Sequence, residues 1–212
     1  MQLPLPIAPR PRLTRADFIA APGNEKALAF LESWPRWPAP AAVLYGPAAS
    51  GKSHLVQVWA ALSGARVIAA AELADAPDGA VAVEDVDAAP GTGHEASLFA
   101  LFERGTPLLL TGRSTPHSWR AGLPDLTSRY GAALGFDLGA PDDALLAGLA
   151  AKLFADRQLT VPDGVIRLMI ERLARSPEAI RDFVAAADAR ALSEKRPVNQ
   201  GLIRDMLATS AS

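Results

Sequence analysis

Cysteine is absent from this chain of 212 residues, and neither charge sign predominates. Without thiols the protein can form neither a disulfide framework nor a thiolate metal site, which fits a reducing compartment. Its 23 acidic and 21 basic residues give a net charge of −2, so the basic excess typical of general nucleic-acid binding is missing. We therefore expect no strong direct binding of DNA.

Long apolar runs are missing too. No stretch approaches the roughly 18 apolar residues of a membrane span, and the N-terminus lacks the apolar core of a signal peptide. A soluble, cytoplasmic protein with no membrane contact is the expectation. The length, with 50% hydrophobic residues, leaves room for one α/β nucleotide-binding domain and a small appendage.

The most informative stretch is residues 41–54, AAVLYGPAASGKSH. An apolar run leads into G-x-x-x-x-G-K-S and a helical pattern follows, which is the order that a phosphate-binding loop requires. Glycine lets backbone N–H groups converge on phosphate oxygens, Lys52 would reach the β- and γ-phosphates, and the Ser53 hydroxyl would bind Mg²⁺. The predicted nucleotide-binding residues are Gly46, Pro47, Ala48, Ala49, Ser50, Gly51, Lys52, Ser53 and His54.

Two carboxylates, Glu84 and Asp85, end another apolar run. Beside a phosphate loop, the first acid can hold the hydration shell of Mg²⁺ and the second can orient a water for attack on a γ-phosphate. Glu84 is therefore a predicted water-mediated Mg²⁺ ligand, and Asp85 is a candidate catalytic residue. Aspartate is usual at the first place, and the extra methylene moves the carboxylate by roughly an ångström, which predicts slow turnover.

The N-terminal segment, residues 1–15, is rich in proline and has no acid. This composition excludes a helix and favours an extended segment that offers Leu3, Leu5 and Ile7 to a partner, although a disordered tail is the alternative. Further on, Asn24 is a predicted helix N-cap. Phe18 and Asn24 are candidates to cover an adenine, or else ordinary core and cap residues.

Apolar and helical segments alternate along the first two thirds of the chain, and helical segments alone follow. Strands are predicted at residues 41–45, 65–70, 79–86, 107–111 and 134–138. These predict an α/β fold with a five-stranded parallel sheet covered on both faces. Helices are predicted at residues 142–159, 165–174, 177–192 and 199–207, with prolines at two of the starts. We predict an extended tail over 1–15, a nucleotide-binding domain over 16–139 and an all-helical lid over 140–212.

Taken together, the motifs resemble the AAA+ module of the bacterial replication initiator DnaA. The resemblance covers nearly the whole chain and is carried by GPAASGKSH, AVEDVD, LLLTG-x-x-x-P, GLPDLTSRY and the four-helix lid. Two features are similar to the Hda family of DnaA inactivators in its alphaproteobacterial form. The chain ends after the lid, and Gln2-Leu3-Pro4-Leu5-Pro6 resembles that family's sliding-clamp-binding motif.

The resemblance implies functions for particular residues. Gln2, Leu3, Leu5 and Pro6 would bind the β sliding clamp of DNA polymerase III. Arg129, in the Ser-Arg-aromatic motif, would act as an arginine finger in trans on ATP held by DnaA, giving inactive ADP-DnaA and restraining replication initiation. ADP or ATP with Mg²⁺ would be the ligand. Monomer, nucleotide-linked homodimer and filament all stay open.

Three positions depart from the family pattern. Family members that hydrolyse ATP keep an aspartate at the position of Glu84 and often have an aspartate near that of Arg113. Arg113 could sense a γ-phosphate, or be an ordinary loop arginine. Glu178 aligns with the lid arginine, which leaves Arg181 as the nearest substitute and a candidate nucleotide ligand. We therefore predict a nucleotide-holding regulator with little ATPase activity of its own. A stand-alone P-loop ATPase or kinase and a helicase loader are the alternative classes.

Overall fold

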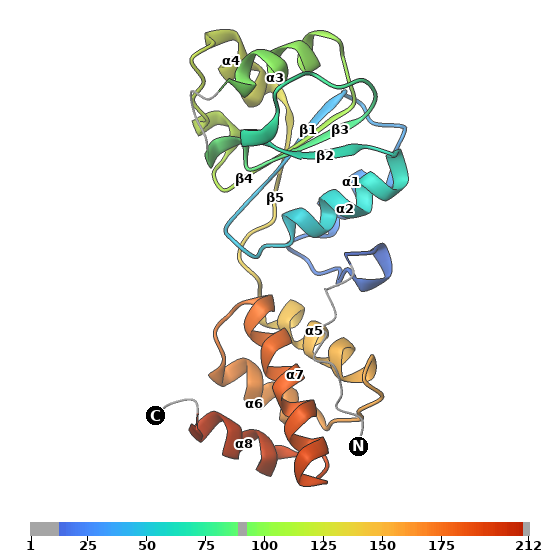
Figure 1. The fold of residues 1–212 in the computed structure, drawn as a ribbon, viewed down its shortest axis with the longest axis vertical. Coiled ribbons are helices and arrows are strands. Elements are labelled where there is room, and N and C mark those ends of the chain that lie inside the picture. Colours follow the sequence, from blue (N-terminus) through green and yellow to red (C-terminus); the bar gives the residue numbers. More distant parts are fainter. Residues whose placement is uncertain (1–12, 89–92, 210–212) are drawn as a thin grey trace, which may run out of the picture.

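The computed structural model describes residues 13–88 and 93–209 (Figure 1). Gln2, Leu3, Leu5 and Pro6, the predicted clamp-binding residues, lie outside these ranges. Figure 1 shows an α/β part built on one sheet and, beyond it, a separate group of helices. Within the described residues, no helix has both the length and the apolar character needed to cross a membrane.

The sheet has five strands in the order β2-β3-β4-β1-β5, and every neighbouring pair is parallel. Its strands are β1 (Ala41–Tyr45), β2 (Arg66–Ala69), β3 (Val81–Glu84), β4 (Leu108–Gly112) and β5 (Leu134–Asp137). All five predicted strands are thus confirmed. The three central strands are apolar along their length because helices cover both faces of the sheet, as parallel sheets require.

Four helices cover the sheet, two on each face: α1 (Glu25–Glu32), α2 (Lys52–Ser63), α3 (His94–Glu103) and α4 (Pro124–Ala132). Successive strand residues point to opposite faces, so Ala42 and Leu44 pack with α1 and α2, whereas Val43 packs with α3 and α4. Short 3₁₀ turns occupy Arg15–Asp17, Ala70–Glu72, Val86–Ala88 and Pro116–Ser118.

Trp34 and Trp37, which precede β1 in a proline-rich segment, pack against the core shared by α1 and α2. Trp37 stacks on Trp59 of α2 at 4.9 Å and on Phe30 of α1 at 4.6 Å. Phe30 in turn contacts Phe136 of β5, the edge strand, at 4.7 Å. This aromatic cluster therefore joins α1, α2 and β5 on one face of the sheet.

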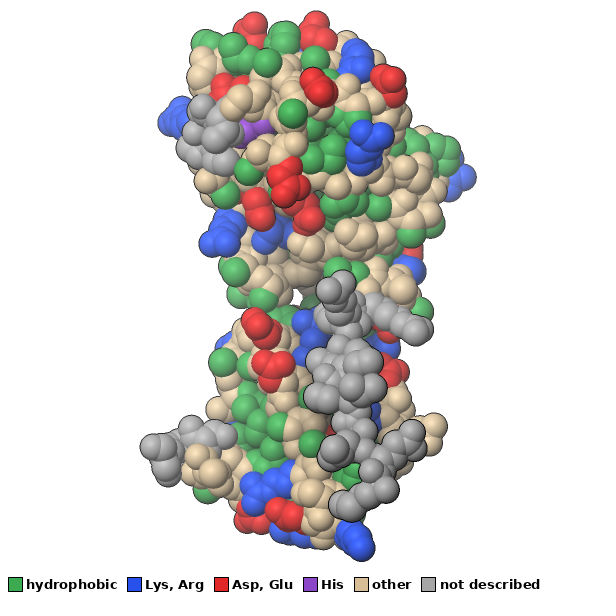
Figure 2. Space-filling view, viewed as in Figure 1, with side chains coloured by type: hydrophobic (Ala, Val, Ile, Leu, Met, Phe, Trp, Pro, Cys, Tyr) green, Lys and Arg blue, Asp and Glu red, His purple; other side chains and the backbone are tan. Residues whose placement is uncertain are grey.

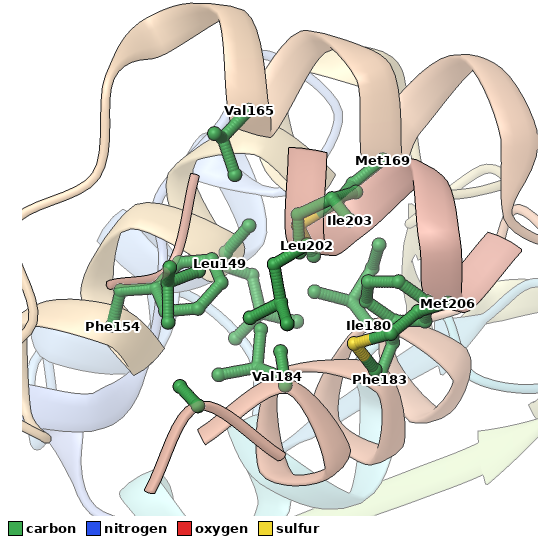
Figure 3. Packing of buried hydrophobic residues seen from close by; sticks show 14 of the residues in the cluster. Leu149, Phe154, Val165, Met169, Ile180, Phe183, Val184, Leu202, Ile203 and Met206 are labelled. Atoms are coloured by element: carbon green, nitrogen blue, oxygen red, sulfur yellow. The ribbon is translucent and has the colours of Figure 1, made fainter. Parts of the chain in front are cut away.

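The remaining helices are α5 (Asp143–Ala155), α6 (Asp163–Arg172), α7 (Pro177–Glu194) and α8 (Gln200–Thr209). They enclose a core of their own, whose members include Phe154, Met169, Val184 and Leu202 (Figure 3). Proline occupies the start of α6 and of α7, as predicted. Helix α5 ends before the predicted residue 159 because Gln158 is left-handed (φ 59°) and the Leu159 N–H bonds to the Phe154 carbonyl.

Asn24 stands at the N-cap position of α1, as predicted. The Asn24 side chain makes no cap hydrogen bond. Its oxygen instead accepts from the Ala21 N–H at 2.9 Å, and its amide donates to the Ile19 carbonyl at 3.0 Å. Through these two hydrogen bonds the buried Asn24 side chain holds the segment that precedes the helix.

Candidate nucleotide-binding site

The loop between β1 and α2 has the backbone that a phosphate cradle needs. Gly46, Ala49 and Gly51 have positive φ angles of 146°, 61° and 96°. A Cβ on Gly46 would lie 3.3 Å from the Ser50 hydroxyl oxygen, so this glycine is also required sterically. Helix α2 begins at Lys52 without a side-chain cap, and its first N–H groups are therefore available to an anion.

The Lys52 ammonium is folded into this loop. It donates to the carbonyls of Gly46 and Pro47, each at 2.8 Å, and to the Ser50 hydroxyl at 3.3 Å. Burial lowers the pKa of Lys52, the nearby charge of Asp85 opposes that shift, and the positive charge of Arg113 adds to it. A phosphate would have to replace the carbonyls as the partner of this ammonium.

The two strand-end acids lie beside the loop. Glu84 is the half-buried last residue of β3, and Asp85 follows in a left-handed conformation with φ 57°. The Asp85 N–H donates to the buried Thr111 hydroxyl of β4 at 3.1 Å, which fixes the end of β3 against β4. Both carboxylates act electrostatically on Lys52 and raise its pKa. The predicted acids and the phosphate loop therefore meet at one edge of the sheet.

A magnesium ion fits the chemistry of these donors. Mg²⁺ is usually held by one or two protein oxygens together with waters and substrate phosphates. The Ser53 hydroxyl in the first turn of α2 and the Glu84 carboxylate would be those donors. Within the described ranges, no group of three or more acidic or histidine side chains could hold a metal by itself. The phosphate would therefore supply part of the coordination.

Sequence reasoning overlooked Asp87, which organises the loop after β4. Its Oδ2 accepts from the N–H groups of Arg113 and Ser114, at 2.8 and 2.9 Å, and from the Ser114 hydroxyl at 2.8 Å. The third acid of the motif AVEDVD was the available signal. Gly112, which precedes this loop, accepts a hydrogen bond from the Gly46 N–H at 3.3 Å. Arg113 therefore directly follows the residue that is hydrogen-bonded to the phosphate loop.

The segment before α1 lies against the other side of the loop. His54 Nε2 is 2.7 Å from the Thr14 carbonyl oxygen, and the Phe18 ring meets His54 edge-on at 5.1 Å. A Cβ on Gly51 would stand 3.6 Å from the Phe18 ring. Phe18 is buried in the core shared by α1 and α2. Its position supports both the packing role and a place beside a bound nucleotide.

Charged residues of the helical part lie near the segment before α1 and the start of α2. Lys152 of α5 pairs with Asp17 at 2.9 Å and with Asp156 at 2.7 Å. Burial lowers the pKa of His54, and the charge of Arg181 on α7 lowers it further. Arg181 is thus close enough to the start of α2 to act on it, whereas Glu178 is exposed in the first turn of α7.

Arg129 belongs to a different surface. It lies on α4, forms an ion pair with Glu103 and is stacked over Phe99 at 5.2 Å, both of these on α3. A shallow pocket of about 300 Å³ is lined by Asp125, Ser128, Arg129 and Ala132. In Figure 1, α4 is at the end of the α/β part farthest from the four-helix part, whereas the loop between β1 and α2 faces those helices. Arg129 is therefore remote from the chain's own phosphate loop.

The buried Glu95 carboxylate fixes the start of α4. Its two oxygens accept from the Gly122 N–H at 3.0 and 2.9 Å, and one also accepts from the Leu123 N–H at 3.2 Å. A carboxylate at a helix N-terminus satisfies free N–H groups and interacts favourably with the helix dipole. No sequence motif indicated this contact, which ties α3 to the start of the helix that carries Arg129.

No protein-family model and no curated protein sequence matches the chain, but solved structures do. Domain III of DnaA from Thermotoga maritima has a TM-score of 0.75 at 18% identity, covering 95% of this chain and 97% of that one. AMPPCP-bound DnaA from Aquifex aeolicus has a TM-score of 0.72 at 16% identity, covering 84% of this chain and 66% of that one. The Thermotoga maritima RuvB branch migration motor has a TM-score of 0.73 at 15% identity, covering 92% of this chain and 71% of that one.

The chain therefore has the fold of DnaA domain III and of the RuvB motor. The predicted fold class, a five-stranded parallel sheet followed by a helical lid, is thereby confirmed. On the face shown in Figure 2, acidic and basic side chains of the described residues are interspersed, and no broad basic patch appears.

Proposed function

We propose that this AAA+ module is a nucleotide-holding regulator that stimulates hydrolysis of ATP bound to DnaA. The observation that carries the proposal is the position of Arg129. The Arg129 side chain is 37% exposed, on a helix remote from the chain's own phosphate loop. An arginine finger in trans must be presented to a neighbouring molecule, and such a residue can be worth about 10³–10⁵ in rate.

The Glu103 pair would keep Arg129 extended until a partner arrives. Both side chains are partly exposed, so this pair is worth little in water and can be exchanged for a phosphate at small cost. Glu95 would hold the N-terminus of α4, and thus the finger, in place. The partner's nucleotide would then meet a positioned guanidinium.

The chain's own site would bind ADP or ATP, as the AMPPCP-bound DnaA neighbour also suggests for this fold. Gly46 to His54 would surround the phosphates, with Ser53 and Glu84 on the Mg²⁺ side and Arg181 on the lid side. The longer Glu84 side chain, together with a cation at Arg113, favours holding nucleotide over hydrolysing it. Asp85 remains the candidate for residual turnover.

Recruitment would use the N-terminal segment. Gln2, Leu3, Leu5 and Pro6 would bind the β sliding clamp, each leucine contributing roughly 1.5–3 kcal/mol. One such short segment binds weakly, so several copies on one clamp ring would strengthen the attachment. Regulation would thus be confined to clamp already loaded on DNA.

The experiment is hydrolysis of ATP preloaded on DnaA, with DNA-loaded clamp present. The intact chain is compared with Arg129→Ala, Gln2→Ala and Arg36→Ala; Arg36 is an exposed arginine with no role assigned here. We expect the intact chain and the Arg36 variant to accelerate hydrolysis. Both of the other variants should leave DnaA at its basal rate, because one lacks the finger and the other lacks the clamp contact.

Two results would contradict the proposal. Unchanged DnaA hydrolysis with the intact chain would reject the regulator function, and binding to a replicative helicase would then favour the loader class. Rapid hydrolysis by the isolated chain, independent of DnaA and clamp, would instead identify a stand-alone ATPase. Omitting DnaA from the assay distinguishes this second case.

A further inference from the structure

The Asp87 carboxylate joins the end of β3 to the loop that follows β4. Its Oδ2 accepts three hydrogen bonds from that loop, two from the N–H groups of Arg113 and Ser114 and one from the Ser114 hydroxyl, at 2.8–2.9 Å. Hydrogen bonds to an ionised acceptor are about twice as strong as neutral ones. The backbone of Arg113 is therefore held by the 3₁₀ turn Val86–Ala88, which follows β3.

The surrounding residues leave this carboxylate little freedom. Its Oδ1 is buried and makes no hydrogen bond within the described residues. A Cβ on Gly112 would lie 2.9 Å from that oxygen and 2.3 Å from the Trp119 ring. The Trp119 indole N–H donates to the Ser114 carbonyl at 2.9 Å and holds the loop from its other side. Asp87, Gly112 and Trp119 thus form one packed unit around the loop.

This unit places Arg113 next to the phosphate loop. Gly112 pairs with Tyr45 in the register of β1 and β4, and its carbonyl accepts from the Gly46 N–H. The Arg113 side chain is exposed, and no ion pair links it to any of the residues that the structure describes. It lies close enough to Lys52 for the two positive charges to affect each other.

Two neighbouring cations at a glycine-rich loop form a site for a multiply charged anion. Arginine suits this place because its planar guanidinium can bind two phosphate oxygens at once. We propose that Asp87 is a positioning residue that holds Arg113 at the phosphate loop, where the guanidinium binds the terminal phosphate of a nucleoside di- or triphosphate and reduces the dependence of binding on Mg²⁺. This inference rests on the proposed binding of nucleotide at the same loop.

Binding of ADP to the full chain, measured by calorimetry with Mg²⁺ and again with EDTA, tests the inference. We expect the intact chain to retain ADP in EDTA. Arg113→Ala should weaken binding about tenfold in EDTA and less when Mg²⁺ supplies the positive charge. Arg113→Lys should restore part of the loss. The control is Arg120→Ala, an exposed arginine further along the same loop region, which should bind ADP like the intact chain.

The role of Asp87 is tested through the double variant. Asp87→Ala should weaken binding about as much as Arg113→Ala, and Asp87→Ala with Arg113→Ala should be no weaker than Arg113→Ala alone, since both changes remove the same contact. Additive losses would overturn the positioning role. Circular dichroism establishes folding; if Asp87→Ala does not fold, Asp87→Asn, which keeps one acceptor oxygen, should show a smaller loss of the same Mg²⁺-dependent kind.

The variant Lys52→Ala distinguishes a failure of this inference from a failure of the proposed nucleotide binding. Loss of ADP binding in Lys52→Ala, combined with unaltered binding in Arg113→Ala under both conditions, would overturn the inference and leave nucleotide binding intact. An intact chain that binds no ADP with or without Mg²⁺ would reject both. Equal losses of ADP affinity in Arg113→Ala with and without Mg²⁺ would also overturn the inference, because Arg113 would then not reduce the dependence of binding on Mg²⁺.

Discussion

Replacing Gly112 by alanine should destabilise the protein, although only one methyl group is added. The new Cβ would lie 2.3 Å and 2.8 Å from two carbons of the Trp119 ring and 2.9 Å from an Asp87 oxygen. The Trp119 side chain is 2% exposed and hydrogen-bonded to the loop, so it cannot swing into solvent. Overpacking of this kind costs about 1–3 kcal/mol, which lowers Tm by about 2–12 °C in a chain of this size.

Urea unfolding followed by far-UV circular dichroism measures this change, with Gly93→Ala as the matched control. Gly93 stands at the start of α3 with φ −60°, and a Cβ there would meet nothing within 4 Å. Alanine at Gly93 should therefore change the free energy of unfolding by less than about 1 kcal/mol, because it restricts the unfolded chain but is a poorer N-cap residue than glycine.

A second change tests whether the steric argument is right. Trp119→Phe removes the ring carbons nearest to the added methyl group and should itself destabilise the protein. In the double variant with Gly112→Ala, the clash is relieved, so the combined loss should be smaller than the sum of the two single losses. Strict additivity, or a Gly112→Ala protein as stable as Gly93→Ala, would refute the reasoning.

Three further results are expected. Arg129→Ala should leave ADP affinity within about twofold of the intact chain while abolishing acceleration of DnaA-bound ATP hydrolysis, since the finger is remote from the chain's own loop. Stability should fall as the pH drops below the ordinary His54 pKa of 6.5, because burial lowers this pKa in the folded state and the unfolded state then binds more protons; His54→Gln should reduce that fall in pH-dependent urea unfolding. Phe154→Ala, at a fully buried site between the lid helices, should cost about 3–5 kcal/mol in the same assay.

The sequence predicted local structure well where one periodicity dominates. The five strands were identified because buried parallel strands are continuous apolar runs, and β1, β3 and β4 are of this kind. It placed Asn24 at the N-cap position of α1 but did not indicate that the side chain bonds backbone groups before the helix. The Asn24 amide can bond backbone groups either before the helix or in its first turn, and sequence alone does not distinguish the two arrangements.

The clamp-binding prediction at residues 2–6 lies outside the described residues, and the roles of Arg129, Asp85 and Arg181 remain predictions. The structure adds their surroundings. It pairs Arg129 with Glu103, fixes Asp85 through Thr111, and brings Arg181 within electrostatic range of His54. None of these partners is near in sequence, so no local pattern could have indicated them.

The sequence by itself determined the features from which phosphate binding at residues 46–54 is predicted, because the glycines that adopt positive φ, the lysine and the helix start all lie within this one segment. Only the tertiary structure decided what stands around that loop. The strand order places β3 beside β4 and β4 beside β1, which brings Asp87, Arg113 and Gly46 together from three segments. Strand order depends on the packing of whole helices and strands, which apolar periodicity along the chain does not encode.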